Sequence, residues 1–216
     1  MAVIVREGLR DIVYKRLHEM IEDSRFVPGT RINVEQLTEE MGVSRTPIWQ
    51  AIGKLEKEGL LVSVPNKGVF VKVLSPEESI DLYSVREVLE CMAAELAAVH
   101  ITGKTIDRME KNLAEQREVI AAKDLVAYGR LDALFHESVY KASTNNYLID
   151  ILGDIQKKMR PMVMHMQDIL NDLYTDHTIL FNALKAGDPQ AARESFRIHN
   201  ERMKSLIRNV ADSGSV

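Results

Sequence analysis

The feature that most constrains the fold of this 216-residue chain is a helical segment followed by two short β-branched runs, all within residues 44–73. Ser44-Arg45-Thr46-Pro47 is typical of a helix start, since hydroxyl groups cap first-turn amides and proline is tolerated there. Gly59 stands where a left-handed residue would end this helix. The runs 61–64 and 69–73 enclose a turn, Pro65-Asn66-Lys67-Gly68, and therefore predict a β-hairpin.

Two further helices are predicted before residue 44. The first carries apolar residues at helical spacing over 9–21. The second opens at Asn33, with Gln36 at the capping-box position, and ends at Gly42. Three helices and a hairpin make a winged helix-turn-helix, in which the N-terminal end of the third helix enters the major groove of DNA.

This part of the chain resembles the DNA-binding domain of the GntR family. The resemblance covers roughly residues 7–73 and lies in the run PGTRINVEQLTEEMGVSRTPIWQAIGKLEKEGLLVSVPNKGVFV, which matches the family's turn, SRTP helix start, EGL helix end and glycine-tipped wing. It implies contacts from Arg45 and Thr46 to base edges or phosphate, and from the wing around Gly68 to the minor groove. The family usually has arginine at the place of Trp49 and glutamate at that of Gln50, so operator sequences do not carry over from relatives.

Four residues on the third helix and two in the hairpin turn are the predicted DNA contacts: Arg45, Thr46, Trp49, Gln50, Lys67 and Gly68. The helix residues should point away from an inner face formed by apolar residues at 48, 52 and 55. Two alternatives stay open. Arg45 and Lys67 could be ordinary solvated charges, and Trp49 could instead pack against the core of its own domain.

Composition and charge limit the class of protein. Hydrophobic residues make up 45% of the chain and charged residues 28%, so the chain should fold, and its length suits two domains. The net charge is +1 over residues 1–74 and −5 over the rest, which permits a DNA-binding head. The single cysteine excludes an intramolecular disulfide, and no apolar run approaches the ~18 residues of a membrane span, so we expect a cytoplasmic protein.

A domain boundary is predicted at Ser75-Pro76-Glu77-Glu78, where a serine cap, a proline and a glutamate mark a helix start. We expect a winged helix-turn-helix domain over 1–74, a linker over 75–78 and a second domain over 79–216. The second domain shows only helical patterns, interrupted by turn signals. The expected fold class is therefore mainly α, a winged head followed by an all-helical bundle.

Ionisable residues lie on the apolar stripes of four predicted helices in the second domain. They are Arg86, Asp132, His136, His177 and His199. Burial of such groups without partners is costly, so we expect them to meet one another or a ligand. One carboxylate oxygen and three imidazole nitrogens suit zinc, nickel, cobalt or manganese and leave a position open for a carboxylate ligand. Arg86 could hold the other end of that ligand through two hydrogen bonds.

Each of these residues has a second interpretation. A histidine on an apolar stripe is more often a hydrogen-bonded core residue than a metal ligand. Arg86 could equally form a buried ion pair with Glu90, one turn later on the same helix.

The second domain resembles the FCD ligand-binding domain, which accompanies the FadR-type regulators of the GntR family. Leu131-Asp132-Ala133-Leu134-Phe135-His136 matches the D-x-x-F-H element of that domain. His177, His199 and Arg86 occupy the places of its two other histidines and its first-helix arginine. The resemblance spans about residues 79–210 and implies an antiparallel helical bundle with a central metal, an organic-acid effector, and a homodimer on a palindromic operator.

The sequence therefore predicts a non-enzymatic transcription regulator, a repressor whose binding to double-stranded DNA responds to a small carboxylate at a metal ion, with zinc first among the metals. One alternative is a metal-dependent hydrolase, since zinc with an open position can activate water. A second alternative is a regulator whose helical half serves only for dimerisation.

Overall fold

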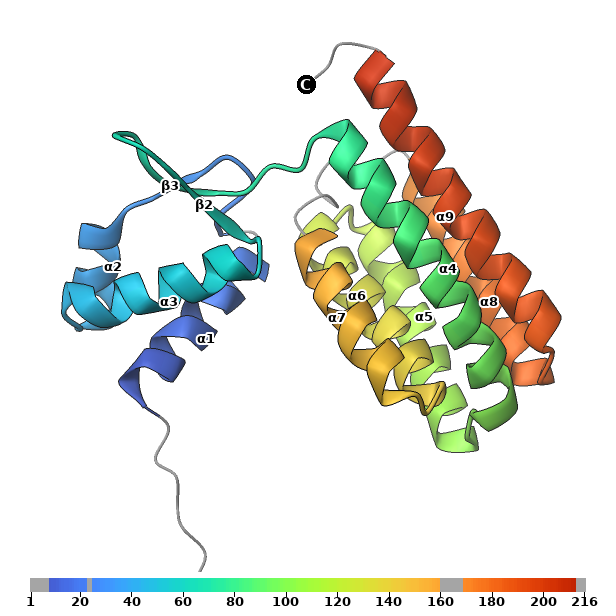
Figure 1. The fold of residues 1–216 in the computed structure, drawn as a ribbon. Helices are drawn as coiled ribbons and strands as arrows, with labels where there is room; N and C mark the ends of the chain where they lie inside the picture. The colour runs from blue at the N-terminus through green and yellow to red at the C-terminus, as the bar shows by residue number, and fades with distance from the viewer. Residues whose placement is uncertain (1–7, 23–24, 160–168, 213–216) are drawn as a thin grey trace, which may run out of the picture. The chain divides into compact units, whose positions relative to one another are not determined.

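The chain divides into two compact units, residues 1–73 and 74–216. The structure is a computed structural model, and it describes residues 8–22, 25–159 and 169–212 (Figure 1). Both units have a hydrophobic core of their own, built from buried apolar side chains.

The first unit is a winged helix-turn-helix, as predicted. Its elements in chain order are α1 (Leu9–Glu22), β1 (Arg31–Ile32), α2 (Val34–Met41), α3 (Arg45–Lys57), β2 (Leu61–Val64) and β3 (Gly68–Val71). The hairpin of β2 and β3 is confirmed. The sequence did not predict β1, which pairs antiparallel with β3 and extends the hairpin to a three-stranded sheet of order β1-β3-β2.

Local signals in the sequence set the ends of these helices. The Asn33 side chain accepts hydrogen bonds from the amides of Glu35 and Gln36 and so caps α2, while Gly42 ends it with a left-handed φ of 63°. Gly59, with a φ of 76°, follows the end of α3. The inner face of α3 is formed by side chains that are fully buried, as expected: Ile48, Ile52 and Leu55.

The second unit is all-helical in its described residues, which confirms the predicted class. Its helices are α4 (Pro76–His100), α5 (Gly103–Ala121), α6 (Leu125–Ala142), α7 (Asn146–Met159), α8 (Leu170–Ala186) and α9 (Pro189–Asp212). The long helices α4 and α9 lie side by side and run in opposite directions (Figure 1). Cross-helix contacts fix this pairing, for example the ion pair of 2.6 Å between Lys204 Nζ and Glu87 Oε2.

The start of α4 lies inside the segment expected to be the linker. Ser75 and Glu78 form a reciprocal capping box, in which each side chain accepts a hydrogen bond from the other residue's backbone amide. Because this box fixes the first turn and Pro76 is compatible with it, residues 76–78 belong to the helix and not to a linker.

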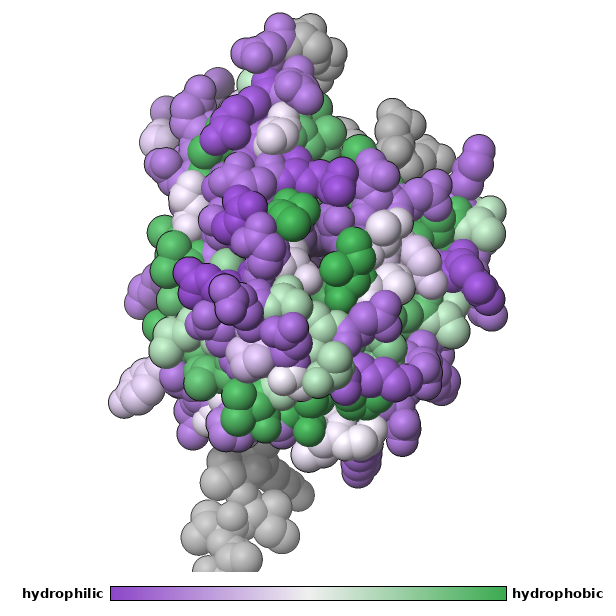
Figure 2. Space-filling view, turned by 90° about the vertical axis from the view of Figure 1, so that its right-hand side faces the viewer, coloured by the Kyte–Doolittle hydropathy of each residue, from purple (hydrophilic) through white to green (hydrophobic). Residues whose placement is uncertain are grey.

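The surface is mainly hydrophilic, with hydrophobic side chains in small groups between the polar ones on the face that Figure 2 shows. None of the described helices is both long and apolar enough to cross a lipid bilayer. A row of exposed apolar residues does follow one side of α4. We call this row, which consists of Val85, Val88, Met92 and Val99, the α4 stripe.

Candidate functional site

Three buried histidines from three helices meet inside the second unit. His136 on α6, His177 on α8 and His199 on α9 each place a ring nitrogen within 4.8 Å of the other two. Their exposed fractions are 4% or less. Three imidazoles around one point form a typical first coordination shell for a divalent transition metal.

Asp132 adds a carboxylate to this group. It lies one turn before His136 on α6, and its Oδ1 is 3.8 Å from His136 Nε2 and 3.5 Å from His177 Nε2. The four residues predicted as ligands are thus close together in the structure. Because the Asp132 side chain is 20% exposed and the histidines are almost fully buried, the carboxylate is on the more open side of the group.

The other ring nitrogen of each histidine faces an oxygen acceptor. His136 Nδ1 is 2.8 Å from Glu90 Oε1, and His177 Nδ1 is 3.0 Å from Gln116 Oε1. His199 Nδ1 lies 3.6 Å from a carboxylate oxygen on α8, Asp176 Oδ2, and makes no hydrogen bond to it. For His136 and His177, an acceptor at Nδ1 favours the tautomer with its proton there, which leaves Nε2 with a lone pair for a metal.

Glu90 is the centre of a buried hydrogen-bond network that joins α4, α6 and α9. Its Oε1 accepts from His136, from Tyr140 Oη at 2.5 Å and from Arg86 Nη2 at 2.9 Å, while its Oε2 accepts from Asn200 Nδ2 at 2.7 Å. Burial alone would raise the pKa of Glu90, but Arg86 and His136 outweigh burial and hold this pKa well below its ordinary value. A charged Glu90 can only accept, so it favours a proton on His136 Nδ1, whereas Arg86 Nη2, which can only donate, lies 3.0 Å from this nitrogen and 3.4 Å from Nε2.

Burial also determines the protonation of two of the histidines. It lowers the pKa of His136, although the Glu90 carboxylate partly opposes the shift. Burial and the neighbouring imidazoles of His199 and His136 hold the pKa of His177 well below its ordinary value. Both side chains are therefore neutral near pH 7, which is the form that binds a metal.

A ring nitrogen at the centre of the group makes no hydrogen bond in the described part of the chain, although the Asp132 carboxylate lies 3.5 Å from it. His177 Nε2 is buried and makes no hydrogen bond to any described residue. A buried polar atom without a partner is costly, and a metal ion would satisfy it. This orphaned nitrogen, together with the donor set, fits a divalent metal ion.

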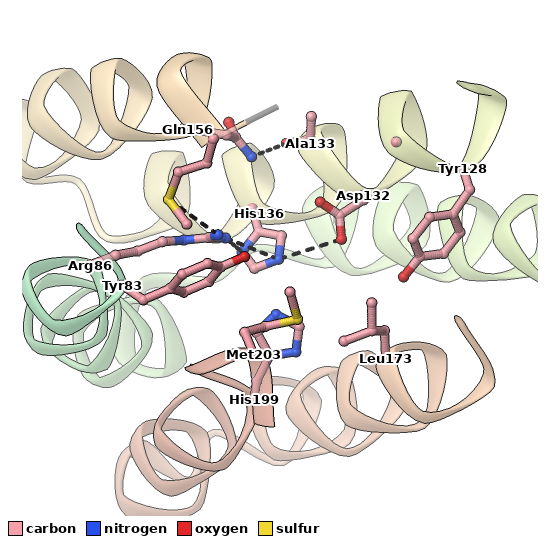
Figure 3. A pocket seen from close by; sticks show the side chains of 12 residues that line it. Tyr83, Arg86, Tyr128, Asp132, Ala133, His136, Gln156, Leu173, His199 and Met203 are labelled. Atoms are coloured by element: carbon pink, nitrogen blue, oxygen red, sulfur yellow. Dashed lines mark hydrogen bonds and ion pairs between the residues drawn. The ribbon is translucent and has the colours of Figure 1, made fainter. Parts of the chain in front are cut away.

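A small cavity of about 30 Å³ adjoins the group, with Tyr83, Arg86, Tyr128, Asp132, His136 and His199 among its lining residues (Figure 3). The hydroxyl of Tyr128 and the Nε of Arg86 are buried without hydrogen-bond partners in the described part of the chain. In Figure 3 the Tyr128 hydroxyl points into the space between Asp132 and Leu173. The cavity has room for a water-sized molecule and offers donors that would suit an oxygen-rich one.

Arg86 both pairs with Glu90 and faces the cavity, so its two interpretations are compatible. Arg86 forms the buried ion pair with Glu90 that the sequence left open, at 2.9 Å and with exposed fractions of 6% and 0%. It also lines the cavity beside Asp132. The guanidinium is thus already engaged on one side and exposed to the cavity on the other.

In the first unit, the predicted DNA contacts of α3 lie on its outer face. Arg45, Thr46, Trp49 and Gln50 are all exposed. Trp49 has an exposed fraction of 49%, so the alternative that it packs in the core of its own unit is wrong. Arg45 forms an exposed ion pair of 2.9 Å with Glu35 on α2, a contact of little energetic weight.

Lys67 and Gly68 lie at the turn between β2 and β3, as predicted. Gly68 has a φ of +113°, and a Cβ added to it would come within 2.9 Å of Arg31 Nε. The positive φ favours glycine here, and the Arg31 side chain, which could move aside, lies beside the turn. Arg31 could not be placed beside the turn from the sequence, because its position depends on strand β1, which the sequence did not predict.

Three polar residues behind the histidines were also missed: Gln116, Asp176 and Asn200. An amide or carboxylate on a helix is usually solvated, and no local signal distinguishes these side chains from surface residues. Only the packing of one helix against another shows that they are buried.

Comparison with protein families assigns both units. The model of the FCD domain matches residues 81–202, and the model described as bacterial regulatory proteins, gntR family, matches residues 9–71. GntR regulators bind DNA operators and commonly dimerise. FCD domains often bind metal ions, and the three buried histidines are a possible site here.

Similar proteins are bacterial transcription regulators. The regulator YdhC of Bacillus subtilis is 29% identical over 93% of this chain and 92% of its own length. The transcriptional repressor RspR of Escherichia coli is 25% identical over 94% of this chain and 90% of its own length.

Solved structures share the fold. McbR/YncC of E. coli aligns with a TM-score of 0.83 at 20% identity, over 94% of this chain and 99% of its own. A GntR transcriptional regulator of Rhodococcus sp. RHA1 aligns with a TM-score of 0.81 at 25% identity, over 93% and 97%. The two family matches and the regulators named above contradict the alternative of a metal-dependent hydrolase. The chain is a transcription regulator, not an enzyme, and belongs to the gntR family of bacterial regulatory proteins with an FCD domain as its second part.

Proposed function

We propose that this regulator senses a small organic acid at a divalent metal ion. Asp132, His136, His177 and His199 would hold the metal, and zinc fits this set of three nitrogens and one oxygen first, before nickel, cobalt or manganese. The observation that carries the proposal is the meeting of three buried ring nitrogens within 4.8 Å, of which His177 Nε2 makes no hydrogen bond to any described residue.

The effector would bind in the cavity beside Asp132. A metal held by four protein ligands can accept a further ligand, and a carboxylate is suited to that position. Arg86 and the Tyr128 hydroxyl line the cavity with unused hydrogen-bonding capacity. Because about 30 Å³ is small, a multi-carbon acid would have to displace neighbouring side chains, and that displacement is the means by which it could alter DNA binding.

The DNA side of the proposal uses the outer face of α3 and the wing. Arg45, Thr46, Trp49 and Gln50 would enter the major groove, and the wing at Lys67 and Gly68 would lie along the minor groove. We propose that the protein acts in the cytoplasm as a repressor, the activity named for the similar RspR of E. coli.

A palindromic operator requires two heads, and hence a homodimer. The α4 stripe supports this part of the proposal, since all four of its residues are apolar and exposed. A helix that is apolar on its solvent side as well as on its core side is typical of one that is covered in the assembled protein.

Metal analysis of the purified full-length protein tests the sensing half. We expect about one ion per chain in the wild type and in the control His100→Ala, whose imidazole is exposed at the end of α4. The ion should be lost in His177→Ala and His199→Ala, with folding checked by circular dichroism. Metal-free wild-type protein, or equal metal content in all variants, would support the alternative that the helical half is only a dimerisation scaffold.

A thermal-shift screen against small organic acids tests the effector. An acid that binds the folded protein raises the melting temperature, and the shift grows with the logarithm of its concentration relative to its Kd. We expect such shifts in metal-loaded protein and not in protein stripped with a chelator. An acid that shifts both forms equally would show that the metal does not take part in sensing.

A further inference from the structure

The outer face of α3 is unusually poor in charge for a DNA-reading surface. Arg45 is its only basic residue before Lys54, and Arg45 lies at the first position of the helix, away from the centre of the face. Lys54 Nζ lies 3.5 Å from the ring centroid of Tyr14, so Lys54 points toward α1. Guanine is read mainly by bidentate arginine or lysine. The centre of this face therefore lacks the usual means of reading a G·C pair.

Trp49 presents an apolar ring where that basic residue would stand. Its exposed fraction is 49%, and the core of the unit is filled without it. An exposed indole gains free energy when a partner covers it, since aromatic side chains bury large apolar areas on binding. The thymine 5-methyl is the apolar group that base pairs offer in the major groove.

Gln50 stands beside Trp49 on the same face. Its side chain is exposed and makes no hydrogen bond to any described residue, so its amide is available. One carboxamide donates and accepts at once, which matches the N7 acceptor and N6 donor of adenine.

Gly53 keeps the approach to both residues open. A Cβ at this position would meet no atom within 4 Å, so the packing of the unit does not require glycine, which weakens a helix interior. Helical side chains lean toward the N-terminus, so a larger residue at 53 would cover the turn that carries Trp49 and Gln50. Because no such side chain is present at Gly53, DNA can come close to Trp49 and Gln50.

We infer that α3 selects adjacent A·T pairs at the centre of each half-site, where Trp49 packs on a thymine methyl group and Gln50 pairs with an adenine. This inference rests on the proposed entry of α3 into the major groove. It names the bases that the recognition surface of this chain prefers.

The inference can be tested by letting the full-length protein select binding sites from randomised duplexes. The affinity for the selected sites is then measured at one fixed salt concentration. Selected half-sites should contain two adjacent A·T pairs. Replacing the contacted thymine by deoxyuridine removes only the methyl group, and should weaken wild-type binding about fourfold, the effect of one buried methyl group. Gln50→Ala should reduce the preference for its A·T pair about tenfold.

Trp49→Ala should bind the thymine and deoxyuridine duplexes equally. The control is Ile12→Ala on α1, where the apolar side chain has the same exposed fraction of 49%, and it should keep the fourfold difference. G·C pairs at the selected centre, or a methyl effect that persists in Trp49→Ala, would overturn the inference. Absence of any sequence-specific DNA binding by the wild type would instead contradict the proposed function.

Discussion

Glu90 shows how one buried charge can organise a site that it does not belong to. It accepts hydrogen bonds from four side chains on three helices, one of them the predicted metal ligand His136. The carboxylate has an exposed fraction of 0%, so its charge is balanced only by what it contacts. Arg86 provides the balancing positive charge. The buried Arg86 guanidinium in turn needs the Glu90 carboxylate as its counter-charge.

Glu90→Gln should therefore destabilise the protein although it keeps the shape of the side chain. The substitution leaves the Arg86 guanidinium buried without a counter-charge, which costs about 3 kcal/mol. Urea unfolding followed by circular dichroism measures the loss. The matched control is Glu95→Gln on the same helix, whose ion pair with Arg193 is exposed and should contribute less than about 1 kcal/mol. Equal losses in the two variants would refute a special role for the buried pair.

Gln116 holds His177 in a similar way, but without charge. Its Oε1 faces His177 Nδ1, and its Nε2 donates to Asn112 Oδ1 at 2.7 Å, which fixes the orientation of the amide. Gln116→Ala should weaken metal binding about tenfold while all four predicted ligands remain. Competition with a chelator of known affinity measures this, and the exposed Gln190→Ala serves as the control. Unchanged affinity in Gln116→Ala would contradict the positioning of His177 by this amide.

At the scale of the elements, much of the fold could be predicted because its signals are local. Capping residues, glycines and apolar periodicity set the ends of α2 and the inner face of α3, and the structure confirms them. Strand β1 could not be predicted, since two residues carry no periodicity and the strand exists only through pairing with β3. The partners behind the histidines were missed for a related reason: they depend on which helices pack together.

The capping box at Ser75 is an element-scale feature with a measurable contribution. Ser75→Ala removes the side-chain acceptor for the Glu78 amide and should destabilise the protein by about 1 kcal/mol. Ser84→Ala lies on the exposed side of the same helix and should change stability by less than about 0.5 kcal/mol. Chemical denaturation measures the free energy of unfolding of both variants. If Ser75→Ala leaves this free energy unchanged, the first turn of α4 is held by other contacts.

For the whole molecule, the α4 stripe is the feature that bears on assembly. Val88, with an exposed fraction of 69%, lies at its centre. If two chains meet there, Val88→Asp buries an unpaired carboxylate and should weaken the dimer at least about tenfold. Sedimentation velocity over a concentration series measures this, together with a parallel fall in affinity for a palindromic duplex.

Ile198→Asp on α9 is the matched control, since Ile198 is also an exposed apolar residue, at 44%, but lies outside the stripe. It should leave the association state unchanged. A dimer that tolerates Val88→Asp as well as Ile198→Asp would place the contact between chains elsewhere on the surface.

Helix α4 has one further consequence, which concerns the transfer of motion. From Glu77 to His100 it contains neither proline nor glycine, the residues at which helices usually bend. Arg86 therefore lies on a stiff rod, ten residues or about 15 Å from the end that follows the wing. A molecule that pulled Arg86 away from Glu90 would tilt the helix. Because the helix is straight and stiff, its N-terminal end and the segment that connects it to the first unit would move with it.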